Sequence, residues 1–244
     1  MGRLSLVFGV GLLLLPSSVL AQSMTIDLGG GAGGSTTAAL LQLVALITIL
    51  SLAPSILVTV TSFTRMVVVL SLLRSALGIQ QTPPNVVLIS LALFLTAFVM
   101  TPVFSTAFED GVTPYLEEQI DEAAAFDATM APFRTFMLDH VREEDLALFL
   151  EMGGADPVAE ADDVPLKSLI PAFMITELRR AFEIGFLLFL PFLIIDMVVA
   201  SILMSMGMMM LPPIIVSLPF KLIFFVLVDG WYLLAGSLVK SYGV

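Results

Sequence analysis

The feature that most constrains the fold is an uncharged stretch of twenty residues, Asn85 to Phe104. As an α-helix it measures about 30 Å, which is the thickness of the hydrocarbon core of a bilayer. Lipid offers no hydrogen-bond partners, so backbone at this depth must form a helix or a closed barrel. Pro83 and Pro84 precede the stretch and suit the beginning of a helix. Together with 58% apolar and 13% charged residues, this predicts an all-α integral membrane protein.

Three further segments are hydrophobic over a comparable length. Thr37 to Val60 is uncharged, and Pro54 is expected to bend it. Ile184 to Pro213 and Leu222 to Val239 lie near the C-terminus. The expected fold is therefore a set of helical hairpins made from four hydrophobic segments, with an acidic helical region between the first two and the last two.

The last two segments differ from ordinary spans because they contain Asp196, Lys221 and Asp229. A carboxylate facing hydrocarbon costs about 2.5 to 3.5 kcal/mol. Proline-broken backbone at membrane depth also persists only where neighbouring protein or a cavity satisfies the freed groups. These segments are therefore expected to face protein or water inside an assembly.

Residues 1–21 have the pattern of a signal peptide, with Arg3, a short apolar core and small-residue spacing before a cleavage site between Ala21 and Gln22. The alternative, an uncleaved first membrane helix, is disfavoured because the apolar core is too short to span a bilayer. The glycine-rich residues 22–36 predict a flexible tether. The mature chain would then begin outside the cytoplasm.

Arg65 and Arg74 are predicted to lie in a short connection between the first two segments, and the positive-inside rule assigns that connection to the cytoplasm. The next segment returns outward, which places the acidic region on the periplasmic side. The expected order is a signal peptide (1–21), a tether (22–36), a first hydrophobic hairpin (37–108), an acidic periplasmic region (109–168) and a second hydrophobic hairpin with a methionine loop (169–244).

The acidic region holds sixteen Asp and Glu residues against three Arg and Lys residues between Glu109 and Lys167. Apolar residues at helical spacing predict two short amphipathic helices that end at Gly153 and Gly154. Their acidic outer face can be a solvated surface or a docking face for a partner. The solvated surface is favoured, because charge runs are ordinary solvent-facing features.

Three long motifs carry a resemblance to a known family. They are "SFTRMVVVLSLLRSALGIQQTPPN" from Ser62 to Asn85, "PAFMITELRRAFEIGFLLFLPFLIIDMVVASILMSMGMMMLPP" from Pro171 to Pro213, and "LPFKLIFFVLVDGW" from Leu218 to Trp231. With the order of signal peptide, hydrophobic segments and acidic region, they make the chain similar to the FliP family of flagellar biosynthesis proteins. The virulence-system relatives of that family, which are export-gate subunits of type III secretion, share the resemblance.

The resemblance implies a homo-oligomeric ring, expected to be pentameric, in the bacterial inner membrane at the flagellar basal body. It implies the export-gate Q and R proteins and larger gate proteins as partners, and a pore that passes unfolded flagellar subunits. Not all four hydrophobic segments need cross lipid in such a complex. The alternatives are a virulence type III export gate and, less favoured, an oligomeric ion channel or transporter, which broken helices with charges can also form.

Methionines crowd the motif between Ser205 and Pro213. Their unbranched, polarisable side chains can close a hole and repack around a passing chain, and Gly207 adds backbone freedom. Composition alone favours ordinary core packing. The resemblance favours a loop that seals the closed pore, with Met206, Met208, Met209 and Met210 as its pore gasket.

Several charged residues have no partner on their own helix with which an ion pair would contribute much to stability. Buried ion pairs are best attested as contacts that fix which partners associate and in which register. We therefore expect these charged residues to pair between subunits, for instance Lys221 with Glu177 or Glu183 of the next copy. The intersubunit candidates are Glu177, Arg180, Glu183, Asp196, Lys221 and Asp229.

Enzymatic readings are poorly supported. His140 is the one histidine and the chain has no cysteine, which disfavours zinc chemistry and a Ser-His triad. Asp196 and Asp229 lack the sequence context of an intramembrane aspartyl dyad, and no phosphate-binding loop is present. No catalytic residue, cofactor or metal is therefore expected.

Overall fold

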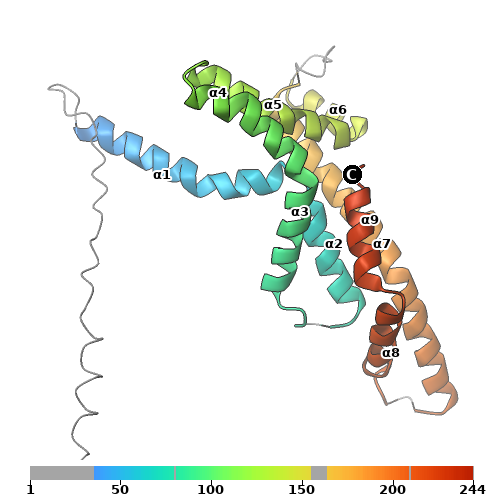
Figure 1. Ribbon diagram of the computed structural model, residues 1–244. Helices are drawn as coiled ribbons and strands as arrows, with labels where there is room; N and C mark the ends of the chain where they lie inside the picture. The colour runs from blue at the N-terminus through green and yellow to red at the C-terminus, as the bar shows by residue number, and fades with distance from the viewer. Residues whose placement is uncertain (1–35, 80, 155–163, 209, 244) are drawn as a thin grey trace, which may run out of the picture. The chain divides into compact units, whose positions relative to one another are not determined.

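The computed structural model describes residues 36–79, 81–154, 164–208 and 210–243, and every regular element in these ranges is a helix (Figure 1). The expected signal peptide, its cleavage site at Ala21 and Gln22, and residues 22–35 of the expected tether lie outside the described residues. The chain divides into two compact units, residues 1–50 and 51–244.

Helix α1, Thr36–Thr59, begins in the first unit and contains no charged residue. It corresponds to the first hydrophobic segment expected from the sequence. Among the described residues, the apolar part of α1 is Leu43–Leu52, which is too short to cross a membrane.

The second unit opens with a hairpin of α2, Phe63–Ala76, and α3, Asn85–Ala107. The two helices pack side by side and run in opposite directions (Figure 1). The sequence assigned residues 63–76 to a short connection, and that prediction was wrong. Apolar residues recur there at helical spacing, and the helix is buried against α3 and α7.

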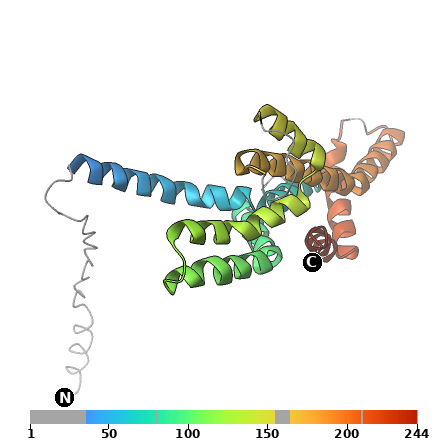
Figure 2. The same cartoon turned by 90° about the horizontal axis from the view of Figure 1, so that it is seen from above.

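Helix α3 continues through a π-helical turn, η1 at Phe108–Val112, into α4, Thr113–Leu116. Helix α5, Glu122–His140, runs back beside them (Figures 1 and 2). Gly111 permits this approach, because a Cβ at that position would lie 2.1 Å from Thr129 Oγ1.

The two amphipathic helices predicted in the acidic region are confirmed as α5 and α6, Glu143–Met152. Asp121 caps α5 by accepting a hydrogen bond from the backbone N–H of Ala124 at 2.9 Å. Helix α6 docks on α7 through the buried Asp145, which accepts a 2.8 Å hydrogen bond from the hydroxyl of Thr176. Arg179 approaches the same carboxylate at 3.4 Å.

Three helices form the C-terminal hairpin: α7, Leu166–Ser205, α8, Pro213–Leu227, and α9, Gly230–Lys240. Helix α7 is 40 residues long, and α8 and α9 return beside it with a 63° bend between them (Figure 1). Gly185 lets α7 approach α2 closely, since a Cβ there would lie 2.2 Å from Cδ1 of Leu72.

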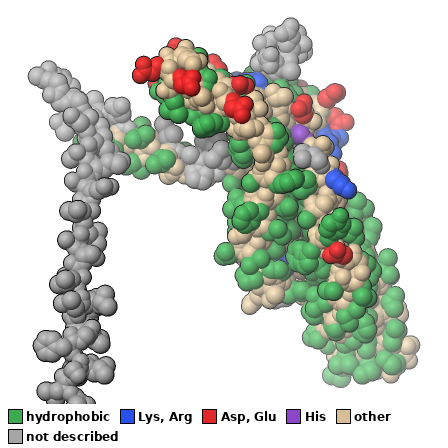
Figure 3. Space-filling model, viewed as in Figure 1, with side chains coloured by type: hydrophobic (Ala, Val, Ile, Leu, Met, Phe, Trp, Pro, Cys, Tyr) green, Lys and Arg blue, Asp and Glu red, His purple; other side chains and the backbone are tan. Residues whose placement is uncertain are grey.

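Within the described residues, two helices are long and apolar enough to cross a membrane, Asn85–Leu116 and Leu166–Ser205. The bent pair α8 and α9 makes a third if it counts as one span. In the second unit, hydrophobic side chains cover the hairpins, whereas Asp and Glu gather over α4 to α6 (Figure 3). The tips of both hairpins lie at the end opposite these acidic helices (Figure 1).

Candidate functional site

The methionine loop, residues 206–212, joins α7 to α8 and is shaped at both ends by local sequence. Gly207 has a φ of +76°, and two backbone hydrogen bonds close a Schellman motif around it. They run from Met208 N–H to Leu203 C=O at 2.9 Å and from Gly207 N–H to Met204 C=O at 3.0 Å. Pro213 then takes the first turn of α8, where its missing N–H is not needed.

Three methionines of this loop are exposed in their own chain. Met206 is 58% exposed, Met208 43% and Met210 97%. Met209, the fourth residue predicted to form the gasket, lies outside the described residues. The core-packing alternative therefore does not hold within one chain for Met206, Met208 and Met210, whose thioethers are free to contact something else.

A partly buried ion pair joins α7 to α8 within the C-terminal hairpin. Lys221 Nζ on α8 donates to Asp196 Oδ2 on α7 at 2.7 Å and to the C=O of Ala76 at 3.2 Å. The hydroxyl of Ser217 donates to the other carboxylate oxygen of Asp196. Lys221 and Ser217 are buried, so the polar groups that a lipid environment would penalise satisfy one another.

A second buried cluster joins α2, α7 and the C-terminus. Arg65 Nε donates to Glu177 Oε2 at 2.9 Å, and Arg65 Nη2 donates to the other oxygen of the same carboxylate. Arg65 Nη1 donates to Ser241 Oγ at 2.8 Å. The hydroxyl of Tyr242 donates to Glu177, and its ring lies 3.9 Å from the guanidinium carbon of Arg65. This cluster is a charge-assisted and cation–π network.

Tyr242 follows the end of α9 and lies outside the candidate spans. Burial raises the pKa of its phenol far above the ordinary 10.0, and the negative charge of Glu177 raises it further. The cations of Arg65 and Arg180 lower this pKa, but by less than burial raises it. The phenol therefore stays protonated and remains a hydrogen-bond donor.

His140 and Asp196, two of the residues considered for enzymatic roles, have contacts within the fold. His140 Nδ1 lies 2.8 Å from the C=O of Phe136, and the imidazole packs against the rings of Phe136 and Tyr242. Asp196 is neutralised by Lys221, whereas Asp229 is exposed in the break between α8 and α9. The described residues contain no cluster of three potential metal ligands.

The charged candidates separate into two groups. Glu177, Asp196 and Lys221 have partners within their own chain, and the fully buried Glu177 is not accessible to a neighbouring copy in this conformation. Arg180, Glu183 and Asp229 are exposed. Pairing of these six residues between subunits stays a prediction.

Sequence reasoning missed Arg65, Tyr242 and Ser217 as members of buried clusters. Arg65 gave one usable signal, because it stands in the strongly apolar run from Phe63 to Leu73, where a cation needs a partner. Tyr242 and Ser217 gave none, since their partners are distant in sequence.

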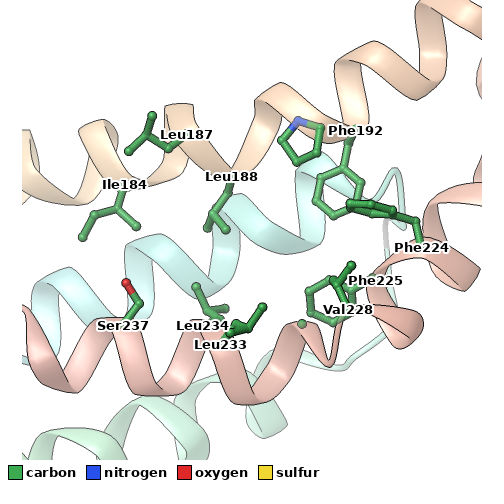
Figure 4. A pocket seen from close by; sticks show the side chains of 12 residues that line it. Ile184, Leu187, Leu188, Phe192, Phe224, Phe225, Val228, Leu233, Leu234 and Ser237 are labelled. Atoms are coloured by element: carbon green, nitrogen blue, oxygen red, sulfur yellow. The ribbon is translucent and has the colours of Figure 1, made fainter.

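A pocket of about 320 Å³ lies between α7 and the bent pair α8 and α9. Figure 4 shows side chains of both helices directed into it, including Ile184 and Leu188 from α7 and Leu234 from α9. Ser237 is the one lining residue with a polar side chain.

Fold and site together define a helical-hairpin membrane protein with an exposed methionine loop at the end opposite its acidic helices. The model of the FliP family matches residues 46–238, and the chain belongs to that family. "Flagellar biosynthetic protein FliP" of Caulobacter vibrioides is 57% identical over 240 residues, covering 98% of this chain and 90% of that protein. The protein of the same name from Agrobacterium fabrum is 50% identical, covering 95% and 96%. That from Bacillus subtilis is 52% identical, covering 82% and 91%.

Proposed function

We propose that the chain is a core pore-forming subunit of the flagellar type III protein export gate. Identical copies form a ring with the Q and R proteins, and the ring passes unfolded flagellar subunits across the inner membrane. The subunit is not an enzyme and needs no cofactor. Membership of the FliP family and relatives named as flagellar biosynthetic proteins support the flagellar system over the virulence one.

The observation that carries the proposal is the exposure of the methionine loop. A turn fixed by Gly207 and Pro213 holds Met206, Met208 and Met210 out of their own chain's core. Large exposed apolar side chains mark an interaction site. Met210 is 97% exposed, and thioethers from several copies can seal a hole and still adapt to irregular cargo.

The outer faces of α7 and α8 support assembly of identical copies. Long apolar side chains such as Met197, Val198 and Ile202 on α7 and Leu227 on α8 are exposed. The exposed charges Arg180, Glu183 and Asp229 then serve as candidate intersubunit contacts, whereas Glu177 and Lys221 hold each subunit together. Helix association in membranes uses packing and polar contacts of this kind.

In the proposed topology, the acidic helices lie in the periplasm and the tips of both hairpins face the cytoplasm. Arg74 lies at the tip of the α2–α3 hairpin, where it donates to the C=O of Pro83 at 3.4 Å, and its charge supports a cytoplasmic position. Arg65 carries no such signal, because Glu177 neutralises it inside the protein.

A transporter or ion channel is the competing function. Lys221 neutralises Asp196 at 2.7 Å. A proton pathway needs a relay of ionisable groups. The ion pair offers no such relay along α7, so the conduit for polypeptide is favoured.

The test is ion leakage through the assembled gate. Cells that express the chain with Ser at positions 206, 208 and 210 should leak ions through the export gate, because small polar side chains cannot close the hole. Met152→Ser changes an exposed methionine on α6, away from the loop and from the outer faces of α7 and α8; it is the control and should leave the membrane tight. Unchanged ion tightness and unchanged flagellar export in the triple variant contradict the proposal.

A further inference from the structure

The pocket between α7 and the bent pair α8 and α9 is called the slot below. Its walls are apolar, so they suit a lipid acyl chain better than water. It extends from Ile184 to Phe192 along α7, about 12 Å of helix. Phe225 and Leu234 line the opposite side, and Figure 4 shows the open slot between the two rows of side chains. Its volume of about 320 Å³ is large enough for part of a small ligand.

One end of the slot lies where the apolar part of α7 begins. Glu183 is the last charged residue before Ile184, and the next charge on the helix is Asp196. The C-terminus lies on the polar side of this point, because the hydroxyl of Tyr242 donates to Glu177, about 10 Å before Ile184 along α7. This end of the slot therefore lies at the boundary between the apolar and polar parts of the chain, where lipid head groups are found.

Two cations extend the lining rows beyond this end. Arg180 precedes Ile184 by four positions on α7, and Lys240 follows Ser237 by three positions on α9, so each continues the pocket face of its helix. Both side chains are exposed, and both are long enough to follow an apolar surface with the charge at its edge. Within one turn of Arg180 on α7, Glu183 is the exposed carboxylate and Glu177 is buried in its ion pair with Arg65, so Arg180 and Lys240 leave a net positive charge.

We propose that the slot binds an acyl chain of an anionic phospholipid, with the phosphate at Arg180 and Lys240. The apolar walls take the chain, and the cations at the membrane boundary take the head group. Phosphate is matched by Arg and Lys through charge-assisted hydrogen bonds. A neighbouring copy of the protein could cover the apolar walls, but an apolar helix surface would leave the charge of Lys240 unused.

Trp231 provides a local probe, because it is the single tryptophan of the chain. Its ring packs edge-on against Phe225, with centroids 5.3 Å apart, and Phe225 lines the slot. A brominated acyl chain in the slot will therefore quench Trp231 fluorescence. The experiment titrates brominated phosphatidylglycerol or brominated phosphatidylcholine into vesicles that hold the full chain.

Phosphatidylglycerol should quench with saturation at a lower mole fraction than phosphatidylcholine. Each cation near the surface should contribute about a fivefold preference. Arg180→Gln and Lys240→Gln should each remove about that factor, and Lys167→Gln, an exposed cation at the start of α7, should not.

Ser237→Phe fills the slot without changing any charge and should abolish the saturable quenching by both lipids. Equal quenching by the two lipids, or a preference that survives both Gln variants, overturns the proposal. Absence of saturable quenching in the unmodified chain also overturns it, since protein then covers the slot.

Discussion

The guanidinium of Arg65 and the carboxylate of Glu177 form a buried two-point ion pair, although 112 positions separate them in the chain. The pair joins the first turn of α2 to the first third of α7. Tyr242 and Ser241 bring the C-terminus to the same place. The cluster therefore holds α2, α7 and the C-terminus together. It thereby positions the C-terminal hairpin, which carries the methionine loop.

Glu177→Ala leaves the Arg65 charge buried without its partner. The free energy of unfolding should fall by about 3 to 5 kcal/mol. Denaturant unfolding in micelles, followed by circular dichroism, measures the change. Glu183→Ala, an exposed carboxylate two turns along α7, is the control and should change it by less than about 0.5 kcal/mol. Similar losses for the two variants would show that the ion pair is not a structural centre.

Tyr242→Phe removes the hydroxyl that donates to Glu177, and its effect should depend on pH. Burial raises the pKa of the folded phenol, so the neutral form is preferred in the folded chain. The stability that Tyr242 adds is therefore present in full below the unfolded pKa of about 10 and is lost as the pH rises further.

Unfolding free energies of the unmodified chain and Tyr242→Phe, measured between pH 8 and 11, test this dependence. Their difference should be constant up to about pH 9 and should then fall by up to about 1.4 kcal/mol per pH unit. Other titrating groups are common to both proteins and cancel in the difference. A difference that is flat to pH 11 would mean that the phenol ionises equally easily in both states.

Lys221→Glu places a second carboxylate beside that of Asp196, and their repulsion should prevent stable assembly with the Q and R proteins. Asp196→Lys in the same chain restores opposite charges and should partly recover the complex, as measured by co-purification. Glu177→Lys should not, because Glu177 binds Arg65 and lies in the other cluster. Recovery with Glu177→Lys and not with Asp196→Lys would instead support pairing between subunits.

Local pattern predicted much of this fold. The uncharged run from Asn85 became the membrane-length helix α3, and the spacing of apolar residues predicted α5 and α6. Gly207, which was expected to add backbone freedom, has a positive φ in the turn that follows α7. These features depend on residues a few positions apart, which periodicity and turn chemistry can detect.

Long-range pairing could not be predicted in the same way. The sequence showed that Lys221 and Asp196 needed partners, but not that they are each other's partner across 25 positions. Arg65 was taken as evidence for a cytoplasmic connection. Its counter-ion, Glu177, lies 112 positions away, so nothing in the sequence showed that the charge is neutralised inside the protein. Helix α2 was read as a connection for the same reason, since its burial depends on α3 and α7 and not on its own length.

Convergence of the methionine loops on one axis can be measured by cross-linking, because the natural chain has no cysteine. Met210→Cys introduces a single thiol at a loop position that is 97% exposed, and Met152→Cys introduces one at an exposed position of α6 as the control. The complex assembled with the Q and R proteins should give disulfide-linked dimers of the chain for Met210→Cys and few for Met152→Cys. Uncross-linked monomer at position 210, under conditions where the ring is intact, would contradict a seal made from these loops.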